Sequence, residues 1–181
     1  GLTVRSIQGF RVIQQSMKLP WPQMVQEIEA LKISQPTKHT PTWHYANIRR
    51  LQEGTPVVKP SELYHAIVIA AYNETKEVIE PTVQAVLDSD YDMQKVIMVF
   101  AYEGRDGAQA EPAVTEIVQK YGNRFAKTMA VKHPLTKGEV RGKGGNITYA
   151  ARQLQDYLQK QNIDPAQVVV TTLDSDNRPH K

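Results

Sequence analysis

From residue 65 onward, short apolar runs alternate with segments that have the spacing of amphipathic helices. The predicted strands cover residues 66–71, 96–101, 125–131 and 168–173. A helix is expected from Pro81 to Leu87, because proline is tolerated only near a helix start. Apolar residues at helical spacing predict two more helices, over residues 114–121 and 147–158. This alternation predicts an α/β fold with a mostly parallel sheet and helices on both faces.

Residues 1–64 form a separate segment that is polar, basic and interrupted by prolines. Two short helices are predicted in it, one starting at Pro22 and one over residues 43–53 with Gly54 as its stop. We find no catalytic pattern here, so a packing or linker segment is expected. The expected organisation is therefore a basic N-terminal segment, residues 1–64, followed by one α/β domain, residues 65–181.

Composition excludes several classes of function. The net charge is +3, and no Lys/Arg run with interleaved aromatic residues is present, so nucleic acid is not an expected partner. The absence of cysteine excludes disulfides, zinc–thiolate sites and a cysteine nucleophile. The longest apolar run, residues 66–71, is far shorter than the roughly 20 residues of a membrane-spanning helix, so we expect the chain itself to be soluble.

Two carboxylates, Asp174 and Asp176, directly follow the last predicted strand. Unpaired carboxylates beside an apolar core are costly, and a divalent cation at the strand end would relieve that cost. Carboxylate oxygens suit Mg²⁺ or Mn²⁺, which can also bridge a diphosphate. The alternative is a loop in which the aspartates only accept backbone N–H bonds as turn formers.

The first predicted strand ends in the sequence Ala71-Tyr72-Asn73-Glu74. Tyr72 can pack on a nucleobase, while Asn73 and Glu74 offer hydrogen-bond groups to a base or a ribose. The alternative is that Asn73 caps the following helix and Tyr72 is an ordinary packing residue. Because ligands of parallel sheets bind outside the carboxyl ends of the strands, this segment is expected at the same rim as Asp176.

A glycine-rich basic segment, residues 141–146, leads into the last predicted helix. Glycines allow a close approach of the backbone to a ligand, and helix N-terminal N–H groups together with Lys143 favour a phosphate. The spacing matches neither a Walker loop nor a dinucleotide-binding fingerprint. The alternative is a flexible glycine turn with a solvated lysine.

In their order along the chain, these three segments resemble those of the family-two glycosyltransferases of the GT-A fold, most of all the processive, cellulose-synthase-like members. The resemblance covers residues 65–181. Its motifs are Ala71-Tyr72-Asn73-Glu74, then Lys143-Gly144-Gly145-Asn146, then Leu173-Asp174-Ser175-Asp176, which is similar to the family's metal-binding DxD segment. The resemblance implies a truncated, Rossmann-like nucleotide-binding half of that fold.

The resemblance also implies a role for each matched residue. The implied base and ribose pocket is lined by Ala71, Tyr72, Asn73 and Glu74. Lys143 would lie near the diphosphate or its sugar, and Asp174 would contact the ribose or sugar side. Asp176, with Asp174 as a second ligand, would coordinate Mn²⁺ or Mg²⁺.

The chain departs from the family pattern in two places. After the second strand the family often has Asp-Asp-Gly-Ser, whose second aspartate reads the base, and here Glu103 is expected to substitute for it. The chain ends at Lys181, so we expect the acceptor-side half, which supplies the general base, to lie outside it. No catalytic residue is assigned, and the near-terminal His180 is expected to be merely exposed.

The predicted function is that of a glycosyltransferase fragment, inactive alone, which binds a UDP-sugar for inverting transfer to a glycan or lipid hydroxyl. In a membrane-embedded full-length protein, the basic N-terminal segment would lie on the cytoplasmic side near lipid headgroups. One alternative is a nucleotidyltransferase, although such enzymes usually place their glycine-rich basic loop straight after the first strand. A second alternative is a non-catalytic α/β interaction module.

Overall fold

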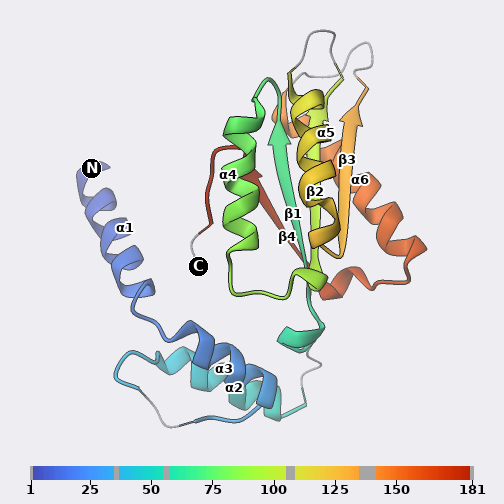
Figure 1. The fold of residues 1–181 in the computed structure, drawn as a ribbon. Coiled ribbons are helices and arrows are strands. Elements are labelled where there is room, and N and C mark those ends of the chain that lie inside the picture. The colour runs from blue at the N-terminus through green and yellow to red at the C-terminus, as the bar shows by residue number, and fades with distance from the viewer. Residues whose placement is uncertain (1, 35–36, 55–57, 105–108, 135–141, 180–181) are drawn as a thin grey trace. The chain divides into compact units, whose positions relative to one another are not determined.

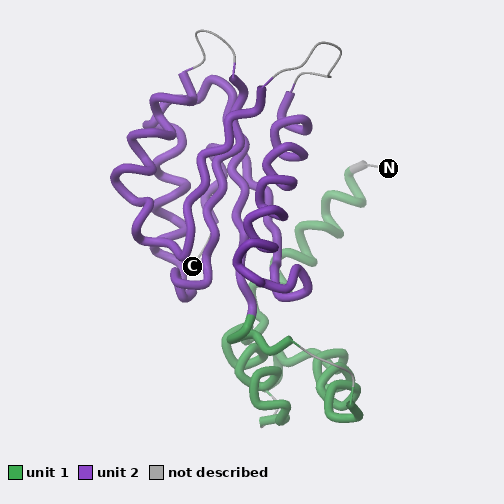
Figure 2. The backbone as a smooth tube through the Cα atoms, turned by 90° about the vertical axis from the view of Figure 1, so that its right-hand side faces the viewer, with its two compact units in different colours: residues 1–62 green, residues 63–181 purple. Residues whose placement is uncertain are grey.

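The computed structural model of the chain describes residues 2–34, 37–54, 58–104, 109–134 and 142–179 (Figure 1). It contains two compact units, Gly1–Glu62 and Leu63–Lys181 (Figure 2). The division between them lies close to the boundary that is expected after residue 64.

The second unit is an α/β domain built on a parallel sheet, as the sequence predicts. Its strands are β1 (Tyr64–Ala71), β2 (Val96–Glu103), β3 (Lys127–His133) and β4 (Val168–Asp174). Its helices are α4 (Lys76–Leu87), α5 (Ala110–Tyr121) and α6 (Lys143–Lys160), with short 3-10 turns η2 (Met93–Lys95), η3 (Gly122–Arg124) and η4 (Pro165–Gln167). The strand order is β3-β2-β1-β4, and every pairing is parallel.

Helices cover both faces of this sheet (Figure 1). On one face, α4 and α5 bury Ile79, Val83 and Ile117 against β1 and β2. On the other face, α6 buries Leu154 and Leu158 against the same strands. Successive residues of β1 and β2 alternate between the two cores, because side chains of a strand point to opposite faces in turn. The predicted layer arrangement is therefore confirmed.

Burial differs sharply between the central and the outer strands. Every residue of β2 is buried, and β1 is buried over its last six residues. In the described part of the sheet β4 is an edge strand, and Val169 and Val170 are 46% and 54% exposed. The apolar run that predicts β4 from the sequence is thus only partly covered.

Several predicted boundaries differ from the structure, and the start of α4 differs most. Helix α4 begins at Lys76, so Pro81 lies inside the helix and not at its start. A proline at that position removes one backbone hydrogen bond. Ile79, Val83 and Val86 form one buried face on both sides of the proline, and their burial offsets that loss. The third strand also differs, because it continues past the predicted end at residue 131.

The strand order creates a switch point between β1 and β4. From β1 the chain moves to β2 and β3 on one side, and α6 then returns it to β4 on the other side. Ligands of open parallel sheets bind outside the carboxyl ends of the strands at such a point. The ends of β1 and β4, together with the start of α6, are therefore the place to look for a site.

The first unit is helical. Its elements are α1 (Leu2–Ser16), α2 (Trp21–Ala30), α3 (Thr42–Gln52) and the 3-10 turn η1 (Pro60–Glu62). Helices α2 and α3 match the two predicted helices, and Gly54 follows α3 with a φ of +99°. Helix α1 is not among the predicted helices. None of the described helices combines the length and the apolar character that crossing a bilayer requires.

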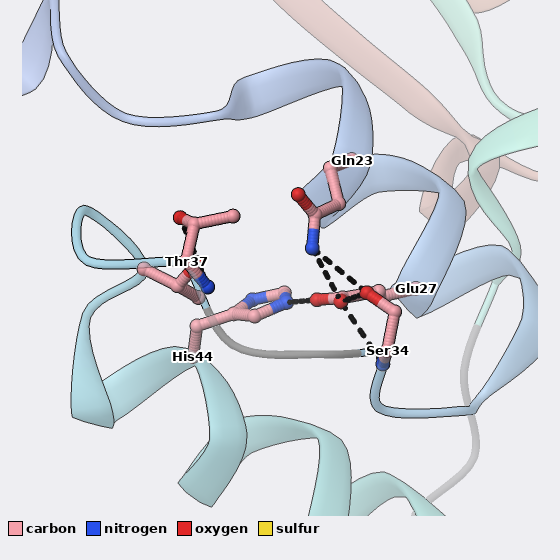
Figure 3. A network of polar contacts seen from close by, with 6 residues as sticks. Gln23, Glu27, Ser34, Thr37 and His44 are labelled. Atoms are coloured by element: carbon pink, nitrogen blue, oxygen red, sulfur yellow. Dashed lines mark hydrogen bonds and ion pairs between the residues drawn. The ribbon is translucent and has the colours of Figure 1, made fainter.

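A buried carboxylate–imidazole pair joins α2 to α3 (Figure 3). Glu27 Oε2 lies 2.7 Å from His44 Nε2, and the two residues are 3% and 1% exposed. The other oxygen of Glu27 accepts hydrogen bonds from Gln23 Nε2 and the Ser34 backbone N–H, both at 3.0 Å, and from the Ser34 hydroxyl. The carboxylate therefore holds α2, α3 and the segment after α2 together.

These contacts keep Glu27 ionised. Burial alone would raise the pKa of Glu27, but hydrogen bonds from Ser34, Gln23 and His44 outweigh it and lower the pKa from 4.5 to about 2. Because the folded-state pKa is depressed, the resulting stability is complete above about 4.5 and is lost as the pH falls toward about 2.

Replacing Glu27 with alanine should destabilise the first unit by about 3–5 kcal/mol, because it leaves His44 buried without its acceptor. In the wild type, acid should unfold this unit as Glu27 becomes protonated. Both tryptophans of the chain, Trp21 and Trp43, lie in this unit, so tryptophan fluorescence in urea and acid titrations reports on it alone. An acid transition that is unchanged in Glu27→Gln would contradict this account.

Candidate functional site

Asp174 and Asp176 flank a buried serine at the carboxyl end of β4. Asp174 is the last residue of β4 and pairs in register with Ala70 of β1. Ser175 is 2% exposed, and its carbonyl accepts a 2.7 Å hydrogen bond from the hydroxyl of Thr82 in α4. Because Ser175 is fixed in the interior, the aspartates on either side of it both face solvent.

Lys143, the first residue of α6, contacts the first of these two aspartates. Its Nζ lies 2.8 Å from Asp174 Oδ1. This hydrogen bond is the main reason why the pKa of Lys143 is raised, and the charges of Asp174, Glu74 and Asp176 raise it further. Both side chains of the ion pair are about half exposed, 47% and 56%, so it adds at most about 1 kcal/mol to stability.

Glu74 folds back onto its own loop. Its Oε2 accepts hydrogen bonds from the backbone N–H groups of Tyr72, at 2.5 Å, and Asn73, at 3.0 Å. Burial would raise the pKa of Glu74, but these bonds and one from the Ser175 hydroxyl outweigh burial and lower the pKa. The ionised carboxylate therefore ties the loop after β1 to the loop after β4.

Asn73 connects the loop after β1 to α5. Its Oδ1 accepts a 3.2 Å hydrogen bond from the backbone N–H of Gln109, which immediately precedes α5. The N-cap of α4 is Thr75, so the interpretation of Asn73 as the helix cap is wrong. Tyr72 is 39% exposed, whereas the side chain of Ala71 lies in the core under α4 and α5.

An open cavity of about 470 Å³ lies between the N-terminal halves of α4 and α5. Its lining includes three carboxylates, Glu77, Glu80 and Glu116. It also includes Lys76, which pairs with Glu116 at 2.9 Å. The same balance of three carboxylates and one lysine surrounds Lys143, so the position at the switch point of the sheet, and not charge, favours the rim as the ligand site.

Glu103 does not face solvent at the rim. It is the last residue of β2, is 1% exposed and pairs in register with His133 of β3. Val99 and Ala101 lie on the same face of β2 as Glu103, because residues two apart along a strand share a face. Both belong to the core covered by α6. Glu103 therefore points to the α6 side of the sheet, where Asn146 is also buried.

Three polar residues near the rim are not among the residues predicted for the site. Ser175, His133 and Asn146 are 2%, 4% and 1% exposed, and each is hydrogen-bonded. Asn146 could have been noticed from spacing, because it continues the stripe Ala150, Leu154 and Leu158 by one helical repeat of four. A polar residue on such a stripe must find a buried partner.

The described residues contain no group of three or more His, Asp or Glu side chains placed to hold a metal ion. Magnesium bound with a nucleotide needs only one or two protein carboxylates, because phosphate and water oxygens complete its coordination. Asp174 and Asp176 offer such oxygens from one exposed turn, so the available donors fit a cation of this kind.

The turn before α6 requires glycine at one position. Gly142 has φ +137° and ψ 179°, a combination that is essentially restricted to glycine. Its carbonyl accepts hydrogen bonds from the N–H groups of Gly145, at 3.1 Å, and Asn146, at 3.3 Å. Gly142 therefore starts the helix and fixes the point from which Lys143 projects.

The structure gathers some of the predicted residues and separates others. The set that meets at the switch point is Glu74, Lys143, Asp174 and Asp176. Ala71 and Glu103 are buried, whereas Arg141 and His180 lie outside the described residues. Comparison with models of known protein families finds no match, and comparison with curated proteins finds no relative. A function must therefore be argued from the geometry.

Replacing Gly142 with alanine should lower the free energy of unfolding by about 1–3 kcal/mol, because alanine rarely adopts this backbone conformation. Gly144 is the matched control, since a Cβ added at either glycine meets no atom within 4 Å. Gly144 lies inside α6, so Gly144→Ala should stabilise the domain by about 0.5–1 kcal/mol. Thermal denaturation without ligand compares the two variants, and equal effects would contradict the conformational requirement at Gly142.

Proposed function

We propose that residues 63–181 bind a nucleoside-diphosphate sugar, with UDP-sugar as the expected donor, as part of a metal-dependent inverting glycosyltransferase. The observation that supports this proposal is the meeting of Glu74, Lys143 and the pair Asp174–Asp176 at the switch point of a parallel sheet. An amine beside exposed carboxylates can accommodate a diphosphate together with a divalent cation.

In this proposal each exposed group at the rim has its own task. Lys143 and the first turn of α6 face the diphosphate, because both favour negative charge. Asp176 and Asp174 would hold Mn²⁺ or Mg²⁺, whose charge stabilises the departing nucleoside diphosphate. Tyr72 offers its ring to the base. The acceptor is a glycan or lipid hydroxyl, and its general base is assigned to none of the described residues.

The loop after β1 argues against a nucleotidyltransferase. Such enzymes usually use a glycine-rich basic loop after the first strand to bind phosphates. Here the backbone N–H groups of Tyr72 and Asn73 already donate to Glu74. The amides that would bind a phosphate are thus occupied by a carboxylate of the protein, and the phosphate-binding role falls to α6.

A non-catalytic interaction module remains the second candidate, and the charge arrangement disfavours it. Three carboxylates act on one lysine, yet the ion pair between Lys143 and Asp174 is too exposed to contribute much stability. A cluster of this kind needs another explanation, and a bound cation with its anionic ligand supplies one.

Helix α1 supports the proposed position of the first unit at the cytoplasmic surface of a membrane. Ile7, Phe10, Ile13 and Met17 recur every three or four residues and are 49% to 68% exposed. The basic residues in this region are Arg5, Arg11 and Lys18, and the first acidic residue of the chain is Glu27. An exposed apolar stripe beside positive charge suits an anionic lipid surface.

Isothermal titration calorimetry should detect binding of UDP in the presence of Mn²⁺ and none in EDTA. Asp176→Asn should weaken this binding at least about tenfold, because it removes a cation ligand. Asp156→Asn is the matched control, since Asp156 is an exposed aspartate further along α6, and it should bind as the wild type does. UDP binding that is unchanged without Mn²⁺ and in Asp176→Asn would favour the interaction module. Activation of a sugar phosphate by a nucleoside triphosphate would favour the nucleotidyltransferase.

The full chain should co-sediment with vesicles that contain anionic phospholipid and much less with zwitterionic vesicles. Phe10→Glu should reduce this binding about tenfold, because it places a charge in the apolar stripe. Val12→Glu adds the same charge at a position that is 62% exposed on the opposite side of α1, and it should bind more strongly than Phe10→Glu. Equal sedimentation with both vesicle types would rule out the proposed lipid surface.

A further inference from the structure

Three polar side chains are buried together under the N-terminal end of α6. They are Glu103 at the end of β2, His133 at the end of β3 and Asn146 in the first turn of α6, and they are 1%, 4% and 1% exposed. Glu103 and His133 are direct partners in the parallel register. Each lies two residues beyond an apolar residue of the core that α6 covers, Ala101 and Val131 respectively, so both point to α6.

His133 makes the contact with the helix. Its Nδ1 lies 3.0 Å from Asn146 Oδ1, which places the proton on Nδ1 because the amide oxygen can only accept. The imidazole ring also packs against Tyr149 of α6, with ring centroids 4.9 Å apart. The end of β3 is thus joined to the start of α6 by a buried hydrogen bond and a ring contact.

The contact is not required for burying the helix. Asn146, Ala150, Leu154 and Leu158 form one buried stripe, and the last three pack against the sheet as apolar side chains. An apolar residue at position 146 could continue that stripe without the cost of desolvating polar groups. What the polar pair adds is a directional bond at a fixed point, and hydrogen bonds define geometry more narrowly than apolar contacts do.

The fixed point lies close to the groups that face the proposed ligand. Asn146 is three residues from Lys143, and its N–H donates to Gly142 O at the start of the same turn. A rotation or fraying of this turn would move the amine of Lys143 away from Asp174 and Asp176. Positions 142 and 144 add little packing that would restrain this turn. Both are glycines, and a Cβ added at either position meets no atom within 4 Å.

We propose that His133 is a positioning residue, which acts through Asn146 to hold the first turn of α6 and Lys143 in place beside the aspartates at the carboxyl end of β4. The consequence for nucleotide affinity rests on the proposed function, but the positioning itself does not. Glu103 is the cross-strand neighbour of the imidazole in this arrangement, and it belongs to the positioning group and not to a base-reading contact.

The experiment compares four variants of the full chain. His133→Leu removes the donor, and Asn146→Ala removes the acceptor with a smaller change of shape. His133→Asn keeps an N–H donor where Nδ1 stands and serves as the conservative rescue. Leu158→Ala is the matched control, because it weakens packing at the other end of the buried stripe without touching the first turn.

Two measurements are made on each variant. Calorimetry with UDP and Mn²⁺ should show an affinity loss of about tenfold in His133→Leu and Asn146→Ala, with His133→Asn and Leu158→Ala within about threefold of the wild type. Hydrogen exchange without ligand follows the amides of Gly145 and Asn146, which donate to Gly142 O. These amides should exchange about tenfold faster in His133→Leu and Asn146→Ala than in Leu158→Ala.

The outcomes separate the positioning role from the proposed function. If the wild type binds UDP and His133→Leu binds equally well, the positioning role is overturned while the proposed function stands. If the wild type does not bind UDP, the proposed function fails and the exchange rates decide alone. The positioning role would be overturned if the exchange rates were unchanged in both His133→Leu and Asn146→Ala. It would also be overturned if Leu158→Ala raised them equally. If either His133→Leu or Asn146→Ala fails to fold, the other variant supplies both measurements.

Discussion

The parallel pairing of β1 with both of its neighbours is the constraint on which the candidate site depends. Ala70 pairs with Ala101 of β2 and with Asp174 of β4, so the three strands end within two residues of one another. Both faces of β1 are buried, and a slip by one residue would exchange the side chains presented to the two cores. The packing of the sheet therefore fixes where Glu74 and Asp176 emerge, although neither residue contributes to the core.

Polar groups at this rim divide by burial into two kinds. Ser175, Thr82 and the His133–Asn146 pair are buried, and their hydrogen bonds fix the loops and the first turn of α6. The exposed side chains include those of Asp174 and Asp176, on either side of Ser175, and that of Lys143. Buried hydrogen bonds limit the motion of the backbone that bears the exposed groups, which is how a solvent-facing cluster can keep a defined geometry.

The parts that follow from local pattern could be predicted, and the parts that follow from tertiary contacts could not. Short continuous apolar runs predict the strands, because burial on both faces leaves that signature, and apolar stripes at helical spacing predict the covering helices. The start of α4 was mispredicted, since Pro81 signals a helix start locally while the core holds the helix together across it. For the same reason Glu103 reads as an exposed strand-end carboxylate in sequence, whereas the register with β3 and the packing of α6 place it inside.

The charge balance of the cluster bears on how a diphosphate could bind there. The described groups are three carboxylates, Glu74, Asp174 and Asp176, against one amine, Lys143, which leaves a net negative charge before any ligand arrives. At a separation of about 5 Å and an effective dielectric constant of about 20, each additional like-charge pair costs about 3 kcal/mol. One lysine cannot offset that repulsion and also hold a diphosphate. A divalent cation shared between Asp176 and the phosphates would reverse the sign of the local field. Under the proposed function, the metal would therefore be a condition of nucleotide binding and not an aid to it.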